Sequence, residues 1–136
     1  MVRDFRELRV WQRAMDLVLL VYSLVRLLPP EERYELGRQL RRACVSVPAN
    51  IAEGNGRLHV REYIHHVYIA RGSLMEVLTG LEIARRLGYV EDSTVRPAFE
   101  LIDHVGRMLT RLARQLQARE AESRVPMAES RCPIHP

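Results

Sequence analysis

Apolar residues recur at alternating spacings of three and four along most of this chain, and this feature constrains its fold more than any other. Such spacing places apolar side chains on one face of an α-helix. Four stretches show it, over residues 8–28, 36–51, 60–84 and 95–116. They are separated by Pro29-Pro30, Gly54-Asn55-Gly56 and Gly88, residue types that end helices. Short connections make long neighbouring helices antiparallel, so we predict an all-α fold, an antiparallel up-down-up-down four-helix bundle.

The first stretch carries more apolar surface than one core-facing strip requires. One stripe consists of Leu8, Trp11, Met15, Val18, Tyr22 and Val25, and a second consists of Val10, Ala14, Leu17, Val21, Leu24 and Leu28. The second stripe lies about 100° around the same helix. Deep burial of the helix is the simpler explanation, but we favour a subunit interface and therefore predict that the chain oligomerises.

The length of 136 residues suits one domain. We predict that residues 1–117 form the bundle and that the polar, proline-bearing segment 118–136 is a disordered C-terminal tail. No apolar run approaches the roughly 18 residues that span a bilayer, so no membrane partner is expected. The charged N-terminus lacks the pattern of a secretion signal, and we expect a cytoplasmic protein.

The second expected helix carries a polar stripe opposite its apolar one. Its members, at spacings of three and four, are Gln39, Arg42, Ser46, Asn50 and Glu53. A solvated face is the ordinary explanation, but Ser and Asn, with Pro48 between them, are poor choices for an exposed helix. The stripe therefore indicates a specific structural or binding requirement.

The stretch 39–57 that contains this stripe resembles the four-helix proteins encoded by intervening sequences in bacterial 23S ribosomal RNA genes. The motif residues are Gln39, Arg42, Ser46, Pro48, Asn50, Glu53, Gly54 and Gly56. Segments 5–11, 69–76 and 81–89 are also similar to the family, and the resemblance covers residues 4–116. Cys44, Asn55 and Gly80 depart from the family pattern, which puts the surface chemistry in doubt.

The resemblance implies partners as well as a fold. It implies a homo-oligomeric ring, a pentamer, of four-helix subunits with a role toward RNA or DNA. A related branch contains the accessory variability proteins of diversity-generating retroelements, which work with a reverse transcriptase. The alternatives are therefore a nucleic-acid-binding scaffold, an accessory subunit of a reverse transcriptase, and a purely structural or protein-interaction oligomer.

Basic residues supply candidate contacts to phosphates. The formal net charge is +4, and all 21 basic residues are arginines. The nucleic-acid-binding candidates are Arg6, Arg9, Arg13, Arg38, Arg41, Arg42, Arg57, Arg107, Arg111 and Arg114. Pairing with nearby carboxylates is the ordinary explanation for any single cluster. No aromatic-interleaved platform accompanies the arginines in sequence, so base-specific readout is not predicted.

Two short patterns raise the question of an enzyme. Glu62-x-x-His65 has the spacing used by di-iron bundles, but the second copy that such a site needs is absent, and we predict no metal and no cofactor. Arg61-x4-His66 resembles the signature of HEPN-type ribonucleases, in which His66 would move protons and Arg61 would stabilise phosphate charge. The neighbouring sequence matches the other family better. We therefore predict no catalytic residues and a non-catalytic protein.

Overall fold

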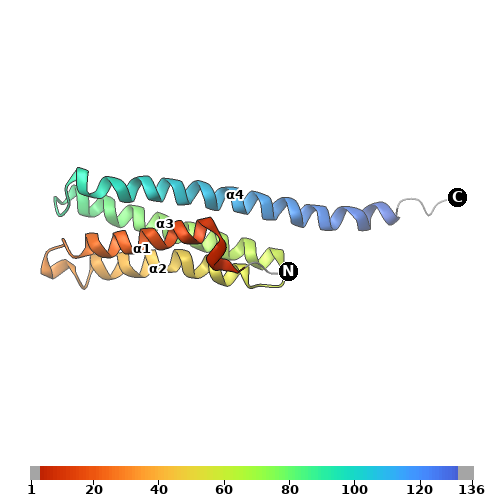
Figure 1. Cartoon of the computed structure of the whole chain (residues 1–136), viewed down its shortest axis with the longest axis horizontal. Coiled ribbons are helices and arrows are strands. Elements are labelled where there is room, and N and C mark those ends of the chain that lie inside the picture. Colours follow the sequence, from red (N-terminus) through yellow and green to blue (C-terminus); the bar gives the residue numbers. More distant parts are fainter. Residues whose placement is uncertain (1–3, 132–136) are drawn as a thin grey trace.

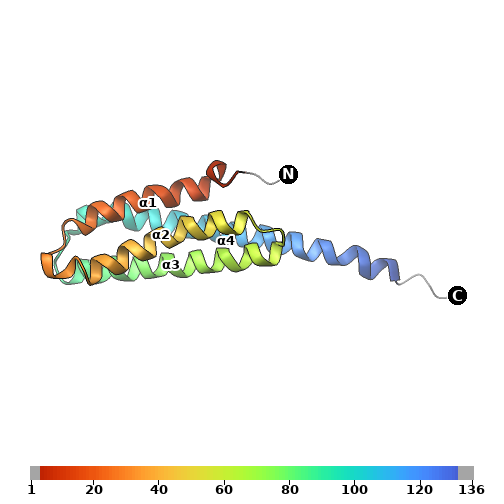
Figure 2. The ribbon, with the colours of Figure 1, turned by 90° about the horizontal axis from the view of Figure 1, so that it is seen from below.

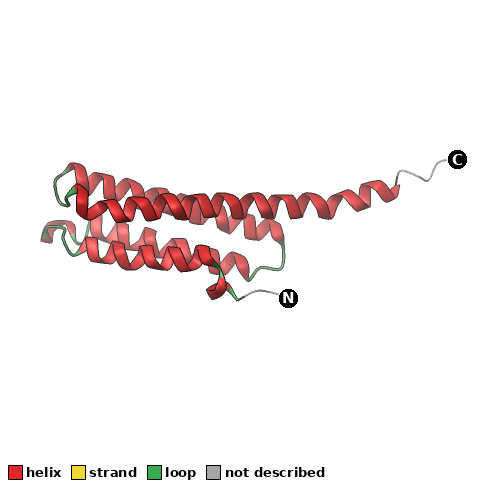
Figure 3. Ribbon diagram, turned by 45° about the horizontal axis from the view of Figure 1, so that its top comes forward, coloured by secondary structure: helices red, strands yellow, loops and turns green. Residues whose placement is uncertain are grey.

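The structure is a computed structural model that describes residues 4–131, with side chains to residue 124. It contains a short 3-10 turn η1 (Phe5–Glu7), helix α1 (Arg9–Val25), a second 3-10 turn η2 (Pro30–Glu32), and helices α2 (Leu36–Asn55), α3 (Val60–Arg86) and α4 (Asp92–Arg131). The prediction of an all-α chain with four long helices is confirmed, and the described residues include no strand (Figure 3).

The helices lie side by side, and their connections alternate between the two ends of the molecule (Figure 1). The loops from α1 to α2 and from α3 to α4 lie at one end, and the loop from α2 to α3 lies at the other (Figures 1 and 2). Each helix packs against two others, α1 on α2 and α4, and α3 on α2 and α4. One hydrophobic core runs between them, with residues from all four helices.

Helix α1 uses its two apolar stripes differently. The stripe from Val10 to Leu28 is fully buried and faces the core. Most of the other stripe is only partly buried, although Val25 is covered. Trp11 packs against Phe5 of η1, with ring centroids 5.3 Å apart in an edge-to-face arrangement. The N-terminal turn therefore covers part of the apolar surface that we attributed to a subunit interface.

Helix α3 ends at Arg86, just before Gly88, the glycine that we expected to end it. Gly88 has a φ of 79°, the left-handed conformation that costs glycine little. The Tyr89 N–H donates to the Ala84 carbonyl at 2.9 Å, and the Gly88 N–H donates to the Arg85 carbonyl at 3.0 Å. This double pairing is the Schellman motif, which satisfies carbonyls at the end of a helix.

Helix α4 continues well beyond the bundle (Figure 1). It extends through residues 118–131, the segment that we predicted to be disordered, so that prediction is wrong there. Ala, Arg and Glu dominate the segment and favour helix formation without an apolar stripe. Glu120 also accepts from Arg61 at 3.2 Å and from Arg124 at 2.7 Å. Residues 132–136 of the predicted tail lie outside the described residues.

Candidate nucleic-acid interface

The polar stripe of α2 meets α3 in a chain of hydrogen bonds. Ser46 and Ser73 share a hydrogen bond of 2.8 Å between their hydroxyl oxygens. Asn50 donates through Nδ2 to the Ser46 carbonyl at 2.9 Å and to the Ser46 hydroxyl at 3.0 Å. The Asn50 Oδ1 lies 3.0 Å from Nδ1 of His66. The stripe is therefore a polar seam between two helices instead of a solvated face.

This chain of bonds fixes the ring of His66. Because Nδ2 of Asn50 already donates to Ser46, its Oδ1 accepts, and Nδ1 of His66 must donate. Every buried side-chain nitrogen and oxygen among the described residues has a partner. The seam thus holds α2 and α3 in one register with its polar groups satisfied.

Glycine allows the two helices to approach closely at both ends of the seam. A Cβ on Gly54 would lie 2.8 Å from Cβ of His66 and 2.9 Å from Cδ1 of Tyr63. A Cβ on Gly80 would lie 2.6 Å from Cδ2 of Leu40, so α2 and α3 approach closely there as well. At Gly72, by contrast, an added Cβ would have no neighbour within 4 Å in this chain.

Helix α2 ends at Asn55, within the stretch Gly54-Asn55-Gly56 that we expected to end it. No left-handed residue closes this end, since Gly88 is the only described residue with positive φ. Gly56 has a φ of −84°. The motif glycine Gly54 is needed for packing against α3, since its position is buried and crowded.

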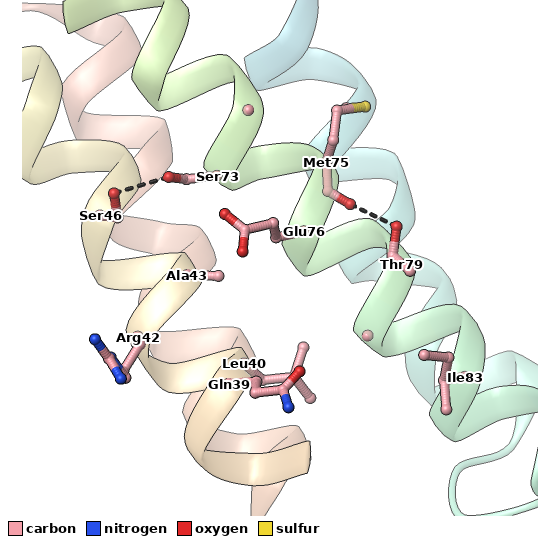
Figure 4. Close-up of a pocket in the computed structure, with 12 residues that line it drawn as sticks. Gln39, Leu40, Arg42, Ala43, Ser46, Ser73, Met75, Glu76, Thr79 and Ile83 are labelled. Atoms are coloured by element: carbon pink, nitrogen blue, oxygen red, sulfur yellow. Dashed lines mark hydrogen bonds between the residues drawn. The ribbon is translucent and has the colours of Figure 1, made fainter. Parts of the chain in front are cut away.

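A groove of about 590 Å³ follows the seam along the outside of α2 and α3. Ser46 and Ser73 point toward each other across it, and Glu76 reaches from α3 toward α2 (Figure 4). The motif residues Gln39 and Arg42 also line this groove. The family motif therefore shapes a surface as well as an interior contact.

The first predicted arginine cluster is largely neutralised. Arg6 pairs with Asp4 at 2.9 Å, and Arg13 pairs with Asp16 at 3.2 Å. The hydrogen bond from Arg6 holds the pKa of the Asp4 carboxyl below its usual value, which keeps the pair charged. Only Arg9 of this cluster has no ion pair among the described residues, so the cluster offers little free positive charge.

The cluster on α2 is different. Arg38, Arg41 and Arg42 line a groove of about 430 Å³ between α1 and α2, and in the described part of the chain none pairs with a carboxylate. Arg41 donates to the Arg33 carbonyl at 3.3 Å. The groove also contains Tyr22 of α1, which is 40% exposed. One aromatic ring therefore lies beside these arginines, which their spacing in the sequence could not show because Tyr22 comes from another helix.

The predicted cluster on α4 gains a member from α3. Arg107, Arg111 and Arg114 line a groove of about 730 Å³ between the two helices, and Arg71 of α3 joins them. Arg107 pairs with Asp103 at 3.1 Å, and among the described residues the other three have no ion pair. Sequence spacing found the α4 residues but not Arg71, because its place depends on how α3 and α4 pack.

The remaining candidate, Arg57, lies in a hollow of about 410 Å³ at the other end of the seam. Arg61, Glu62, His65 and His66 also line it, so the residues of the ribonuclease pattern do come together. Arg57 pairs with Glu53 at 2.7 Å, however, and Arg61 pairs with Glu120 at 3.2 Å. Carboxylates thus compete with phosphate for both guanidinium groups.

A metal centre and a membrane span are two further possibilities for the described part of the chain. No three His, Cys, Asp or Glu side chains there come together in a way that could hold a metal ion. No helix between residues 4 and 131 is long and apolar enough to cross a membrane.

Comparison with known families decides the relationship. The family model of the 23S rRNA-intervening sequence protein matches residues 6–111, which include all of α1, α2 and α3 and half of α4. The chain belongs to this family. The matched residues include the whole polar seam and the arginines of α2, and they include Arg71, Arg107 and Arg111 of the second groove but not Arg114. No curated protein matches the chain.

Proposed function

We propose that this member of the intervening-sequence family is a non-catalytic, homo-oligomeric scaffold that binds RNA or DNA through its unpaired arginines. One observation carries the nucleic-acid part. Arg38, Arg41 and Arg42 are adjacent on α2, line one groove, and have no carboxylate partner among the described residues. Guanidinium groups that are not neutralised by the protein itself are free to contact phosphates.

Whether an arginine pairs with a carboxylate should affect phosphate binding more than the number of arginines does. A phosphate that contacts Arg38 displaces only water and counterions, whereas a phosphate at Arg6 must compete with Asp4. The groove between α3 and α4 adds Arg71, Arg111 and Arg114. Repetition of these surfaces in an oligomer would raise the affinity for a long polyanion by multivalency.

A salt series tests this proposal. Binding of a labelled RNA is measured between about 50 and 200 mM salt, where affinity falls as phosphates release counterions. We expect the triple variant Arg38→Gln, Arg41→Gln, Arg42→Gln to bind more weakly. The slope of log affinity against log salt is negative, and loss of three phosphate contacts to a single strand should make it shallower by about 2.

The chain offers a matched control of equal charge. Changing Arg6, Arg13 and Arg124 to Gln removes the same charge from arginines that already pair with Asp4, Asp16 and Glu120. We expect this variant to keep most of the wild-type affinity and slope. Equal losses in both triple variants would show that net charge alone governs binding, and absence of binding by the wild type would reject the nucleic-acid function.

The oligomeric part of the proposal rests on an outer stripe of α3, consisting of Tyr68, Gly72, Met75, Thr79 and Ile83. All five are exposed, although three are large and hydrophobic. Gly72 at its centre costs about 1 kcal/mol in a helix interior and has no neighbour within 4 Å. A second copy packed on this stripe would cover the apolar side chains and use the close approach that glycine permits. The pentameric ring follows from the family resemblance.

Light scattering after size exclusion tests the stripe. We expect an oligomer for the wild type and a smaller mass for Gly72→Arg, which places a charge within the stripe. Gly56→Arg is the control, because Gly56 is exposed and lies outside the stripe. A monomeric wild type would reject the ring, while an unchanged mass for Gly72→Arg would place the interface elsewhere.

The ribonuclease alternative keeps one observation in its favour, the meeting of Arg61 and His66 in one hollow. It is tested by incubating RNA with the wild type and with His66→Ala. We expect intact RNA in both. Cleavage by the wild type that is lost in His66→Ala would replace the scaffold proposal with a catalytic one.

A further inference from the structure

The groove between α1 and α2 combines two features that the other basic surfaces lack together. It contains three arginines without carboxylate partners among the described residues, and no Asp or Glu lines it. It also contains an accessible aromatic side chain, Tyr22, beside the exposed Val45. By comparison, the groove between α3 and α4 includes Asp103, and its aromatic residue, Phe99, is partly buried against the core.

We infer that this groove is a binding site for single-stranded nucleic acid, in which a base stacks on Tyr22 while neighbouring phosphates contact Arg38, Arg41 and Arg42. The inference rests on the proposed nucleic-acid function and specifies its ligand. Proteins that bind single strands without sequence preference combine a basic groove with aromatic side chains on which bases stack. Every base has such a face, so the site requires no particular sequence.

The positions of the residues suit one strand. The arginines lie on successive turns of α2, and Tyr22 approaches from the opposite wall, α1. Arg38 and Arg42 are four residues apart, which is about 6 Å along the helix axis. One strand in the groove can therefore present phosphates to α2 and turn a base toward α1. A duplex keeps its bases stacked inside, so it can use the arginines but not Tyr22.

The test compares a single strand with a duplex. Anisotropy of labelled oligouridylate and of a duplex RNA of equal length is measured at low salt for the wild type, Tyr22→Leu and Tyr22→Phe. We expect Tyr22→Leu to weaken binding of the single strand by about 5- to 150-fold, the usual effect of losing one stacked base. Duplex binding should change less than about twofold, and Tyr22→Phe should behave as the wild type because it keeps the ring.

Tyr34→Leu is the control. Tyr34 is 80% exposed against 40% for Tyr22, but it lies between η2 and α2 and does not line the groove. We expect it to bind the single strand as the wild type does. Thermal melting of each variant checks that the fold is retained, and Tyr22→Phe provides the comparison if Tyr22→Leu is destabilised.

The outcomes separate this inference from the function on which it rests. Equal effects of Tyr22→Leu on single strand and duplex, or no effect on either, would overturn the stacking site while salt-dependent RNA binding still stood. Failure of the wild type to bind any nucleic acid would overturn both. A parallel series with oligodeoxyuridylate, which differs from oligouridylate only in the 2′-hydroxyl, tells whether the sugar matters: equal affinity supports recognition through base and phosphate alone, and a preference for oligouridylate supports a single-strand site that also contacts the 2′-hydroxyl.

Discussion

Gly80 and Gly72 lie two turns apart on α3, and they face different surroundings. A Cβ on Gly80 would lie 2.6 Å from Leu40 of α2, whereas a Cβ on Gly72 would meet nothing within 4 Å. Each glycine costs the helix about 1 kcal/mol relative to alanine. The packing of this chain therefore accounts for Gly80 but gives no reason for Gly72.

The difference extends to the two sides of α3 on which these residues lie. The side toward α2 is closed by the polar seam and by the glycine contacts at Gly54 and Gly80. The outer stripe around Gly72 leaves Tyr68, Met75 and Ile83 exposed. The closed side explains how the chain folds, and the open side is the surface on which we propose that a second copy packs.

The largest effect should come from Gly54, because the atoms around it on the closed side cannot easily move aside. We predict that Gly54→Ala lowers the free energy of unfolding by about 3 kcal/mol, the upper end of the cost of overpacking. The added methyl would meet Cβ of His66 and the ring of Tyr63, neither of which is the end of a flexible side chain. Urea denaturation measures the change. Gly56→Ala, whose nearest contact would be 3.7 Å, is the control, and equal stability of the two variants would contradict a closed seam.

Cys44 reports whether the interior next to the seam stays closed. Burial raises the pKa of its thiol from 9.0 to about 11, so the reactive thiolate at pH 8 is about 100-fold rarer than in an ordinary cysteine. Cys132, the other cysteine of the chain, is first changed to Ser so that only Cys44 can react. We then predict that iodoacetamide alkylates Cys44 of the folded protein at least about 100-fold more slowly than Cys44 of the protein unfolded in urea. Fast alkylation under native conditions would mean that the helices open readily.

The same shift predicts how stability depends on pH. Between pH 9.0 and about 11 the unfolded chain has lost the Cys44 proton while the folded chain keeps it, so the free energy of unfolding falls as pH rises through this window. Burial also raises the pKa of Tyr63, which acts in the same direction. Urea denaturation across this window, with Cys44→Ala as the comparison, measures the contribution of the thiol.

The hydrogen bonds of the seam should contribute less than its glycine packing. We predict that Asn50→Ala costs about 2 kcal/mol, because it removes the hydrogen bond to the Ser46 hydroxyl and leaves Nδ1 of His66 without its partner in a partly buried place. Gln117→Ala removes an exposed hydrogen bond to Tyr68 and should cost less than about 0.5 kcal/mol. Equal losses of unfolding free energy in the two variants would indicate that water takes over the hydrogen bonds of Asn50, and the seam would then be open to solvent.

Some features of the fold can be predicted from the sequence, and others cannot. Periodicity locates the helices, and Gly88 marks the end of α3, because both signals depend on nearby residues. The polar stripe of α2 is also visible as unusual. Its partners Ser73 and His66 are not, since they lie 27 and 16 residues away from Ser46 and Asn50 and depend on the register between two helices.

The same limit explains the site residues that the sequence did not reveal. Tyr22 meets the arginines of α2, and Arg71 meets those of α4, only after the helices pack. The ion pairs that neutralise Arg6 and Arg13 involve near neighbours and were open to prediction from spacing. The extension of α4 was missed because the polar, proline-bearing composition was taken as a sign of disorder, although Ala, Arg and Glu make up most of the segment.

The smallest predicted effect has the opposite sign and tests the open side of α3. Within one subunit, Gly72→Ala should raise the free energy of unfolding by about 0.5 to 1 kcal/mol, because alanine favours the helix and its methyl group meets nothing. In an oligomer that packs on the outer stripe, the same methyl lies in a close contact and weakens assembly. Urea denaturation and light scattering over a range of protein concentrations separate the two effects. A variant that is more stable at low concentration but dissociates more readily would show that Gly72 is kept for a partner, and one that is simply more stable would leave the outer stripe without an interface.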